Sequence, residues 1–127
     1  MQLIGVDLGG TQIRAALAGD DGVIERRVAT LTLADEGPDA VIARICTQIE
    51  EAWGDAPVAA IGLGAPGPTD PYEGVVLVGP NLPGWHNIPL RQLQLDAWRS
   101  RLAVVSQTPL LFSDTAASNI ALGCPSA

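Results

Sequence analysis

The sequence predicts an α/β fold in which a mixed β-sheet is flanked by helices. Short apolar runs separated by glycine turns fill the first quarter of the chain, which is typical of consecutive strands. Val41, Ile45 and Ile49 then recur every four residues, which indicates a helix. Apolar runs return at residues 58–64 and 102–105, with a second predicted helix between them. Leaving aside a short strand at residues 75–78 and a short final helix, the predicted element order is β-β-β-α-β-α-β.

The first three elements are strands joined by tight turns. Residues 3–8 form a buried apolar run that ends in glycines, and residues 13–18 form the second run. Residues 19–22 (GDDG) are a hairpin turn signal, and residues 23–31 alternate well enough to be a third strand. We expect these three strands to pair antiparallel in chain order.

The first predicted helix has sequence signals at both ends. Pro38 suits the first helical turn, and Gly54 ends the apolar period. Residues 58–64 then return to the sheet as a buried strand after a crossover.

The second half of the chain predicts three more elements and a short final helix. Residues 75–78 form a short strand, residues 89–100 a second helix and residues 102–105 a further strand. We expect Ser113 or Asp114 to cap the final helix.

Charge and composition exclude several classes of partner. The net charge is −7, all 7 positive side chains are arginines, and the chain contains no lysine. Without a clustered positive surface, we expect neither nucleic acid nor a membrane surface as a partner.

Cys46 and Cys124 match no metal-ligand spacing, and Cys46 falls on the apolar side of the first helix. No basic segment precedes an apolar run and no run approaches the roughly eighteen apolar residues of a spanning helix, so the predicted location is cytoplasmic.

The glycine turn after the first strand is the strongest candidate for a binding site. Gly9 and Gly10 let backbone N–H groups approach phosphate oxygens, and Thr11 adds a hydroxyl donor. Asp7 at the strand end could hold water bound to Mg²⁺, and Arg14 could add positive charge. The alternative is an ordinary β-hairpin whose glycines serve only the turn geometry. The spacing by itself is compatible with both interpretations.

Three motifs in order resemble the ROK (repressor, open reading frame, kinase) family, which includes bacterial glucokinases and transcriptional repressors. They are residues 4–11 (IGVDLGGT), residues 60–68 (AIGLGAPGP) and residues 80–85 (PNLPGW). The resemblance runs from the start of the chain to about Arg91. It implies the amino-terminal lobe of an actin-like, ribonuclease-H-like fold and the ATP-dependent phosphorylation of a hexose.

The same resemblance implies roles for individual residues. Residues 7–11 would face the phosphate of Mg-ATP, with Asp7 reaching Mg²⁺ through water. Gly64, Gly67 and Asn81 would lie beside a glucose-like hexose. The zinc-binding cluster of many ROK proteins and a second lobe would belong to a carboxy-terminal half that we expect this chain to lack.

Three other features have simpler interpretations. Residues 62–67 have the glycine spacing of a dinucleotide-binding motif, but Pro66 and Pro68 oppose the helix that such a motif needs. The single histidine, His86, is predicted to be a surface group. Trp85 is predicted to pack in the core, as is Trp98.

The chain departs from the ROK pattern where the family has its catalytic aspartate. That aspartate, a general base for the attacking sugar hydroxyl, should follow the strand at residues 102–105. Residues 106–109 (SQTP) contain no carboxylate. Asp114 is the nearest candidate base, although it comes several residues late and also suits a helix cap.

Residues 95–123 resemble a different family, the Q-loop region of ABC-transporter ATPases. In that family the glutamine matching Gln107 senses Mg²⁺ and the attacking water. A P-loop for ATP is excluded because its lysine does not occur in this chain. The sequence therefore predicts a ROK-like region at residues 1–94 and an ABC-like tail at residues 95–127, packed as one domain. A natural recombinant, an assembly error and a deliberate chimera are all compatible with this junction.

These observations predict a truncated or chimeric hexose kinase lobe that binds phosphate and has little or no activity alone. A ligand-free scaffold or interaction module is the alternative, and a fragment of a ROK repressor is a third interpretation. Apolar sheet surface meant for a second lobe leads us to expect a homodimer.

Overall fold

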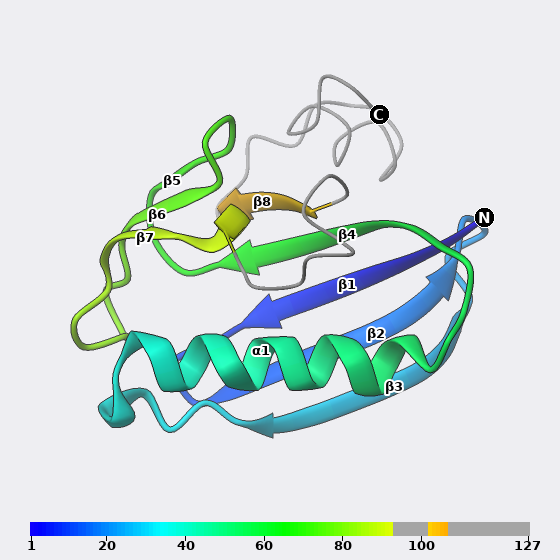
Figure 1. Ribbon diagram of the computed structural model, residues 1–127, viewed down its shortest axis with the longest axis horizontal. Coiled ribbons are helices and arrows are strands. Elements are labelled where there is room, and N and C mark those ends of the chain that lie inside the picture. Colours follow the sequence, from blue (N-terminus) through cyan, green and yellow to red (C-terminus); the bar gives the residue numbers. More distant parts are fainter. Residues whose placement is uncertain (93–101, 107–127) are drawn as a thin grey trace.

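The computed structural model describes residues 1–92 and 102–106, which form two β-sheets and one α-helix (Figure 1). The larger sheet has five strands in the order β3-β2-β1-β4-β8, and the smaller has three in the order β5-β6-β7. In chain order the strands are β1 (Gln2–Leu8), β2 (Gln12–Gly19), β3 (Ile24–Leu31), β4 (Val58–Ala65), β5 (Thr69–Asp70), β6 (Val75–Val78), β7 (His86–Pro89) and β8 (Leu102–Ser106). The helices are η1 (Ala34–Glu36), α1 (Pro38–Trp53) and η2 (Leu90–Gln92), of which η1 and η2 are 3₁₀-helices.

Strand directions make the larger sheet mixed. β1, β2 and β3 pair antiparallel, and Leu8 lies opposite Ile13 at the last pair before the glycine turn. β4 runs parallel to β1, because α1 carries the chain back along the sheet between β3 and β4. β8 in turn runs parallel to β4. The predicted mixed sheet with three leading antiparallel strands is confirmed.

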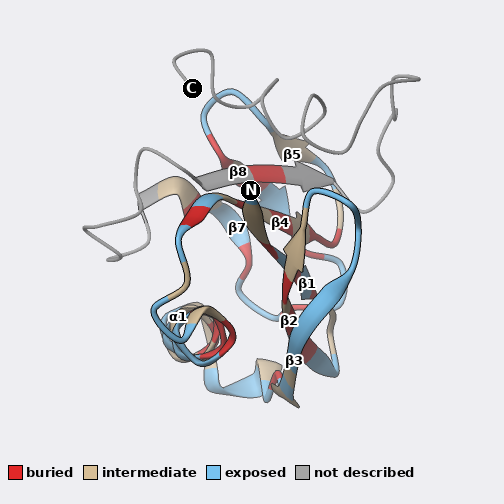
Figure 2. Ribbon diagram, turned by 90° about the vertical axis from the view of Figure 1, so that its right-hand side faces the viewer, coloured by how far each residue is buried: buried red, intermediate tan, exposed pale blue. Residues whose placement is uncertain are grey.

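α1 packs on one face of the larger sheet (Figures 1 and 2). Pro38 lies in its first turn, and Gly54 ends it in a left-handed conformation with a φ of 52°. Its inward residues Val41, Ile45 and Ile49 are fully buried, as their spacing predicts. They share one core with alternate residues of β1 and β2, namely Ile4, Val6, Leu8, Ile13, Ala15 and Leu17. Burial of each large aliphatic side chain contributes about 1.5–3 kcal/mol. Among the described residues, no helix is both long and apolar enough to span a membrane.

The region after β6 differs from the prediction. Pro89 does not start a helix: it ends β7 opposite Val75, and residues Leu90–Gln92 form η2. β7 is an edge strand, where a residue without an N–H is tolerated. The full burial of Leu90 holds this segment in place. The remainder of the predicted second helix, Trp98 and the predicted final helix lie outside the described residues.

The strand at residues 75–78 is confirmed, whereas β5 and β7 were not predicted. They contain 2 and 4 residues, which is too short for an alternating pattern to stand out. Both pair with β6. The PNLPGW segment, residues 80–85, therefore connects β6 to β7 within the smaller sheet.

Candidate functional site

The glycine turn joins β1 to β2 at one end of the larger sheet. The Gly9 N–H donates to the Gln12 carbonyl at 2.9 Å, so this amide closes the turn. In the part of the chain that the structure describes, the N–H groups of Gly10 and Thr11 have no protein acceptor. Two neighbouring amides are therefore available to an anion, while Gly9 shapes the turn.

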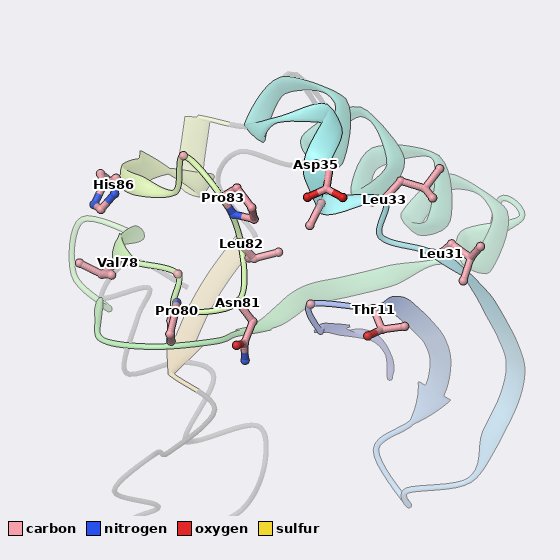
Figure 3. A pocket seen from close by; sticks show the side chains of 14 residues that line it. Thr11, Leu31, Leu33, Asp35, Val78, Pro80, Asn81, Leu82, Pro83 and His86 are labelled. Atoms are coloured by element: carbon pink, nitrogen blue, oxygen red, sulfur yellow. The ribbon is translucent and has the colours of Figure 1, made fainter.

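An open groove of about 700 Å³ lies against this turn (Figure 3). Of the residues predicted for phosphate and sugar, Gly10, Thr11 and Asn81 line it. Thr11 and Asn81 lie along one edge in Figure 3, and Asp35 lies along the opposite edge. The remaining walls are largely apolar and come from the end of β3, the segment after it, the end of β6 and the loop before β7: Leu31, Leu33, Ala34, Val78, Pro80, Leu82 and Pro83.

The turn and the PNLPGW loop touch directly. A Cβ atom placed on Gly10 would lie 2.9 Å from the Asn81 Cβ and 3.0 Å from the Asn81 carbonyl oxygen. Real Cβ atoms essentially never approach that closely, so only glycine fits here without displacing the loop. The first and third motifs of the sequence thus meet at one place.

Asp7 and Arg14 lie on a different side of the turn. They are cross-strand neighbours, and their side chains approach to 3.9 Å with more than half of each exposed. Arg14 also donates to the Gln12 side chain at 2.9 Å. Neither residue lines the groove. Since alternate strand residues face opposite sides of a sheet, the two side chains lie on the face opposite α1, away from buried Leu8 and Ile13.

The Asp7 carboxylate fits a magnesium ion that is held mainly by water and phosphate. Mg²⁺ keeps several waters and commonly takes one or two protein carboxylates beside its nucleotide. The Asp7 side chain is 55% exposed at the carboxyl end of β1. Within residues 1–92 and 102–106, no group of three or more His, Cys, Asp or Glu side chains could hold a metal without such help.

The other two predicted sugar residues, Gly64 and Gly67, do not line the groove. Gly64 is the parallel partner of Asp7 across β1 and β4. Gly67 has a φ of 83°, and the Val78 carbonyl occupies the place where its Cβ would be. Gly67 is therefore required by the backbone path that brings β6 to the groove. Asp114, the candidate base, lies outside the described residues.

The structure places Trp85, His86 and Cys46 as the sequence predicts. Trp85 is fully buried and His86 is exposed at the groove, as predicted. Cys46 packs against the core, also as predicted. Burial raises the pKa of the Cys46 thiol, and the nearby Glu50 charge adds to this effect. The thiol is therefore protonated at neutral pH and is a poor nucleophile.

Sequence reasoning missed Thr32, Leu33 and Asp35. Thr32 is fully buried and hydrogen-bonded to the glycine turn, whereas Leu33 and Asp35 line the groove. Leu33 has a φ of 49°, which an apolar residue rarely adopts. No local pattern marks these residues, because their contacts are with segments distant in sequence.

Comparison with known proteins identifies the family. Residues 3–97 match the family model described as ROK family. The chain belongs to the ROK family. The glucokinase of Thermotoga maritima is 42% identical over 90 residues, which are 71% of this chain and 28% of that protein. A ROK family glucokinase from Streptomyces griseus, solved in complex with glucose and AMPPNP, superposes with a TM-score of 0.75 at 28% identity.

The ROK relatives confirm the predicted fold. The Streptomyces match covers 84% of this chain and 33% of that chain, and the observed lobe has the actin-like, ribonuclease-H-like fold of these kinases. The chain spans about a third or less of the length of the kinases it matches.

A second similarity is to a different family of proteins. The multidrug resistance-like ATP-binding protein MdlA of Escherichia coli is 79% identical over 43 residues, which are 34% of this chain and 7% of that protein. The predicted resemblance of the tail to ABC-transporter ATPases is confirmed.

Proposed function

We propose that this ROK chain is the phosphate-binding lobe of an ATP-dependent, glucokinase-like hexose kinase. The observation that carries the proposal is one groove, in which the Gly10 and Thr11 amides, without an acceptor among residues 1–92 and 102–106, lie beside Asn81. Backbone amides of a glycine turn suit phosphate oxygens, and a side-chain amide suits sugar hydroxyls. Similarity to glucokinases supports the same assignment.

Each residue has a distinct role in this proposal. The N–H groups of Gly10 and Thr11 and the Thr11 hydroxyl donate to phosphate, while Gly9 closes the turn. Asp7 holds water on the Mg²⁺ of Mg-ATP, which supplies the transferred phosphoryl group. Arg14 lies beside Asp7 and adds positive charge on the outer side of the turn.

Asn81 orients the sugar, and Gly64 and Gly67 shape the backbone next to it. Asn81 is exposed, so its amide can reach a ligand in the groove. Gly67 keeps the chain close to β6, and Gly64 lies beside Asp7 in the sheet. These two glycines act through the backbone.

The charge of the groove favours a nucleotide that arrives with its magnesium. Asp35 lines the groove, and none of the described residues that line it is an arginine. A bare polyphosphate would face this carboxylate without a compensating cation. We therefore expect Mg-ATP to bind at least about tenfold more tightly than ATP in excess chelator, a factor that corresponds to about 1.4 kcal/mol.

We propose that turnover by this chain is slow or absent. Residues 106–109 have no carboxylate at the position of the family base, and Asp114 is the proposed substitute. Deprotonation of the sugar hydroxyl would then depend on a carboxylate that comes several residues late in the sequence. The two family similarities lead us to propose that a ROK segment and an ABC-ATPase segment were joined in this chain, and that it acts in the cytoplasm.

Exposed apolar side chains near the β2–β3 turn support a proposal of self-association. Met1, Val23 and Ile24 are 62%, 59% and 47% exposed and lie at the same end of the sheet. Sedimentation at increasing concentration tests this, and a monomer at every concentration would contradict it.

Titration calorimetry with Mg-ATP and with glucose tests the kinase-lobe proposal. Binding of both ligands, with weaker nucleotide binding in chelator, is the expected result. At a hundredfold excess over Kd, either ligand should stabilise the fold by about 2.7 kcal/mol. A well-dispersed NMR spectrum that neither ligand changes would instead identify a ligand-free scaffold.

A further inference from the structure

We infer that Thr32 is the positioning residue of the glycine turn and that Arg44 positions Thr32. The inference rests on the proposed function, because it concerns the same phosphate site. Thr32 is fully buried just beyond the end of β3. Its surroundings provide a partner for every polar atom it has.

Two of these partners are in the glycine turn. The Thr32 hydroxyl donates to the Gly9 carbonyl at 2.7 Å, and the Thr32 N–H donates to the Thr11 carbonyl at 2.8 Å. One residue therefore holds the carbonyl groups on both sides of Gly10.

Because the peptide bond is planar, the hydrogen bond to the Gly9 carbonyl also fixes the direction of the Gly10 N–H, a proposed phosphate donor. The Gly9 carbonyl and the Gly10 N–H belong to one trans peptide unit, in which the two groups point in opposite directions. Because the Gly9 carbonyl is held toward Thr32, the Gly10 N–H points away from Thr32 and from the interior. Without the hydroxyl, this peptide unit could rotate and the donor would lose its orientation.

Arg44 connects this arrangement to the helix. Its guanidinium donates to the Thr32 carbonyl at 3.0 Å and forms an ion pair with Glu36 on η1. The Arg44 side chain is 23% exposed, so it is held mostly within the protein. Between these two contacts lies Leu33, whose left-handed backbone projects an exposed apolar side chain at the groove.

Left-handed backbone at a leucine is unfavourable and persists only where the surroundings enforce it. Here the enforcing contacts are the hydrogen bonds of Thr32 on one side and the Arg44–Glu36 pair on the other. The same contacts that orient the Gly10 amide therefore also set the opposite wall of the groove.

Thr32→Val and Thr32→Ser test the inference. Valine keeps the shape but loses the hydroxyl, whereas serine keeps the hydroxyl. Thr47→Val is the matched control, because Thr47 also donates its hydroxyl to a carbonyl, at 3.1 Å, but on the exposed side of α1. We expect Mg-ATP to bind about tenfold more weakly to Thr32→Val, as loss of one buried hydrogen bond implies. Thr32→Ser and Thr47→Val should stay within about threefold of the unmodified chain.

Hydrogen exchange of the ligand-free protein gives a second measurement that needs no nucleotide. The Gly9 N–H, bonded to Gln12, should exchange about tenfold faster in Thr32→Val, whereas the Val6 amide in the middle of β1 should not change. If Thr32→Val does not fold, Arg44→Met should increase Gly9 exchange in the same direction.

The two measurements separate the two proposals. If the unmodified chain does not bind Mg-ATP, the kinase-lobe proposal fails, and Gly9 exchange alone decides the role of Thr32. Unchanged Gly9 exchange in folded Thr32→Val overturns the positioning role. Equal loss of Mg-ATP affinity in the valine and serine variants also overturns it, because the hydroxyl would then not be the cause.

Discussion

The two walls of the groove are held in different ways. The turn wall, residues 9–11, is held by hydrogen bonds to Gln12 and Thr32. The loop wall, residues 78–86, is held by the buried side chains of Leu82 and Trp85. The backbone hydrogen bonds of its residues 79–86 that the structure describes join residues of the same loop. Figure 3 shows the loop curving over the groove with Leu82 directed inward.

This difference determines what each wall contributes. A hydrogen bond adds only about 0.5–1.5 kcal/mol net, but it fixes the direction of a group. A large buried side chain adds several kcal/mol and has little directional preference. We therefore expect changes at the turn wall to alter ligand orientation, and changes beneath the loop wall to remove the wall itself.

The largest expected effect comes from removing the aromatic anchor of the loop wall. Trp85→Ala should lower the free energy of unfolding by about 3–5 kcal/mol, because it leaves a large cavity beneath the loop. Urea unfolding followed by far-UV circular dichroism measures this change.

Trp85→Phe is the control for that prediction. It keeps most of the ring, and it removes an indole N–H that has no partner within the described residues. The loss for phenylalanine should be less than half of that for alanine. A loss of less than about 1 kcal/mol for alanine would show that Trp85 is not the anchor.

A second change acts where the two walls meet. Gly10→Ala should lower the free energy of unfolding by about 1–3 kcal/mol, because its Cβ would be 2.9 Å from the Asn81 Cβ. Both Mg-ATP and glucose should bind at least about tenfold more weakly, since turn and loop must separate. Calorimetry measures both affinities.

Gly5→Ala is the matched control, because nothing lies within 4 Å of the Cβ that it would add. This control should bind both ligands as the unmodified chain does. If Gly10→Ala weakened only one ligand, the close contact between the walls would not be what couples them.

A smaller effect is expected at Leu33, the strained residue of the groove wall opposite the turn. Leu33→Asn should raise the free energy of unfolding by about 0.5–1 kcal/mol, because asparagine tolerates the left-handed backbone better than leucine. At the same time the groove loses an apolar wall, so glucose should bind more weakly. Thermal unfolding measures the expected gain in stability, and calorimetry on the same samples measures the expected loss of glucose affinity. Lower stability together with unchanged affinity would show that Leu33 is neither strained nor part of the site.

The main elements of this fold could be predicted from the sequence because their signals are local. Strand alternation and the four-residue spacing of Val41, Ile45 and Ile49 gave the chain order of β1 to β4, the antiparallel pairing of β1 to β3 and the burial of α1. The place of Asn81 near the glycine turn was expected only from the resemblance to the ROK family, which three motifs carry; both line the groove.

The rest of the groove could not be predicted because it depends on contacts between distant segments. Thr32 has no motif, and its importance comes from the carbonyl groups of Gly9 and Thr11, which fold back beside it. Asp35 reaches the groove only because η1 turns the chain after β3. Pro89 suggested a helix start, but the burial of Leu90 and pairing with Val75 override that local preference.

The smallest expected change in stability concerns the exposed amide of the loop wall. Asn81→Ala should change the free energy of unfolding by less than about 0.5 kcal/mol, because the side chain is exposed. Glucose should nevertheless bind about tenfold more weakly, while Mg-ATP affinity should stay within about twofold, since the phosphate donors belong to the turn wall. His86→Ala is the control, because His86 is also exposed on the loop wall and lines the same groove. Equal losses of both ligands in Asn81→Ala would mean that the loop wall positions the nucleotide as well, and the division of roles between the two walls would be wrong.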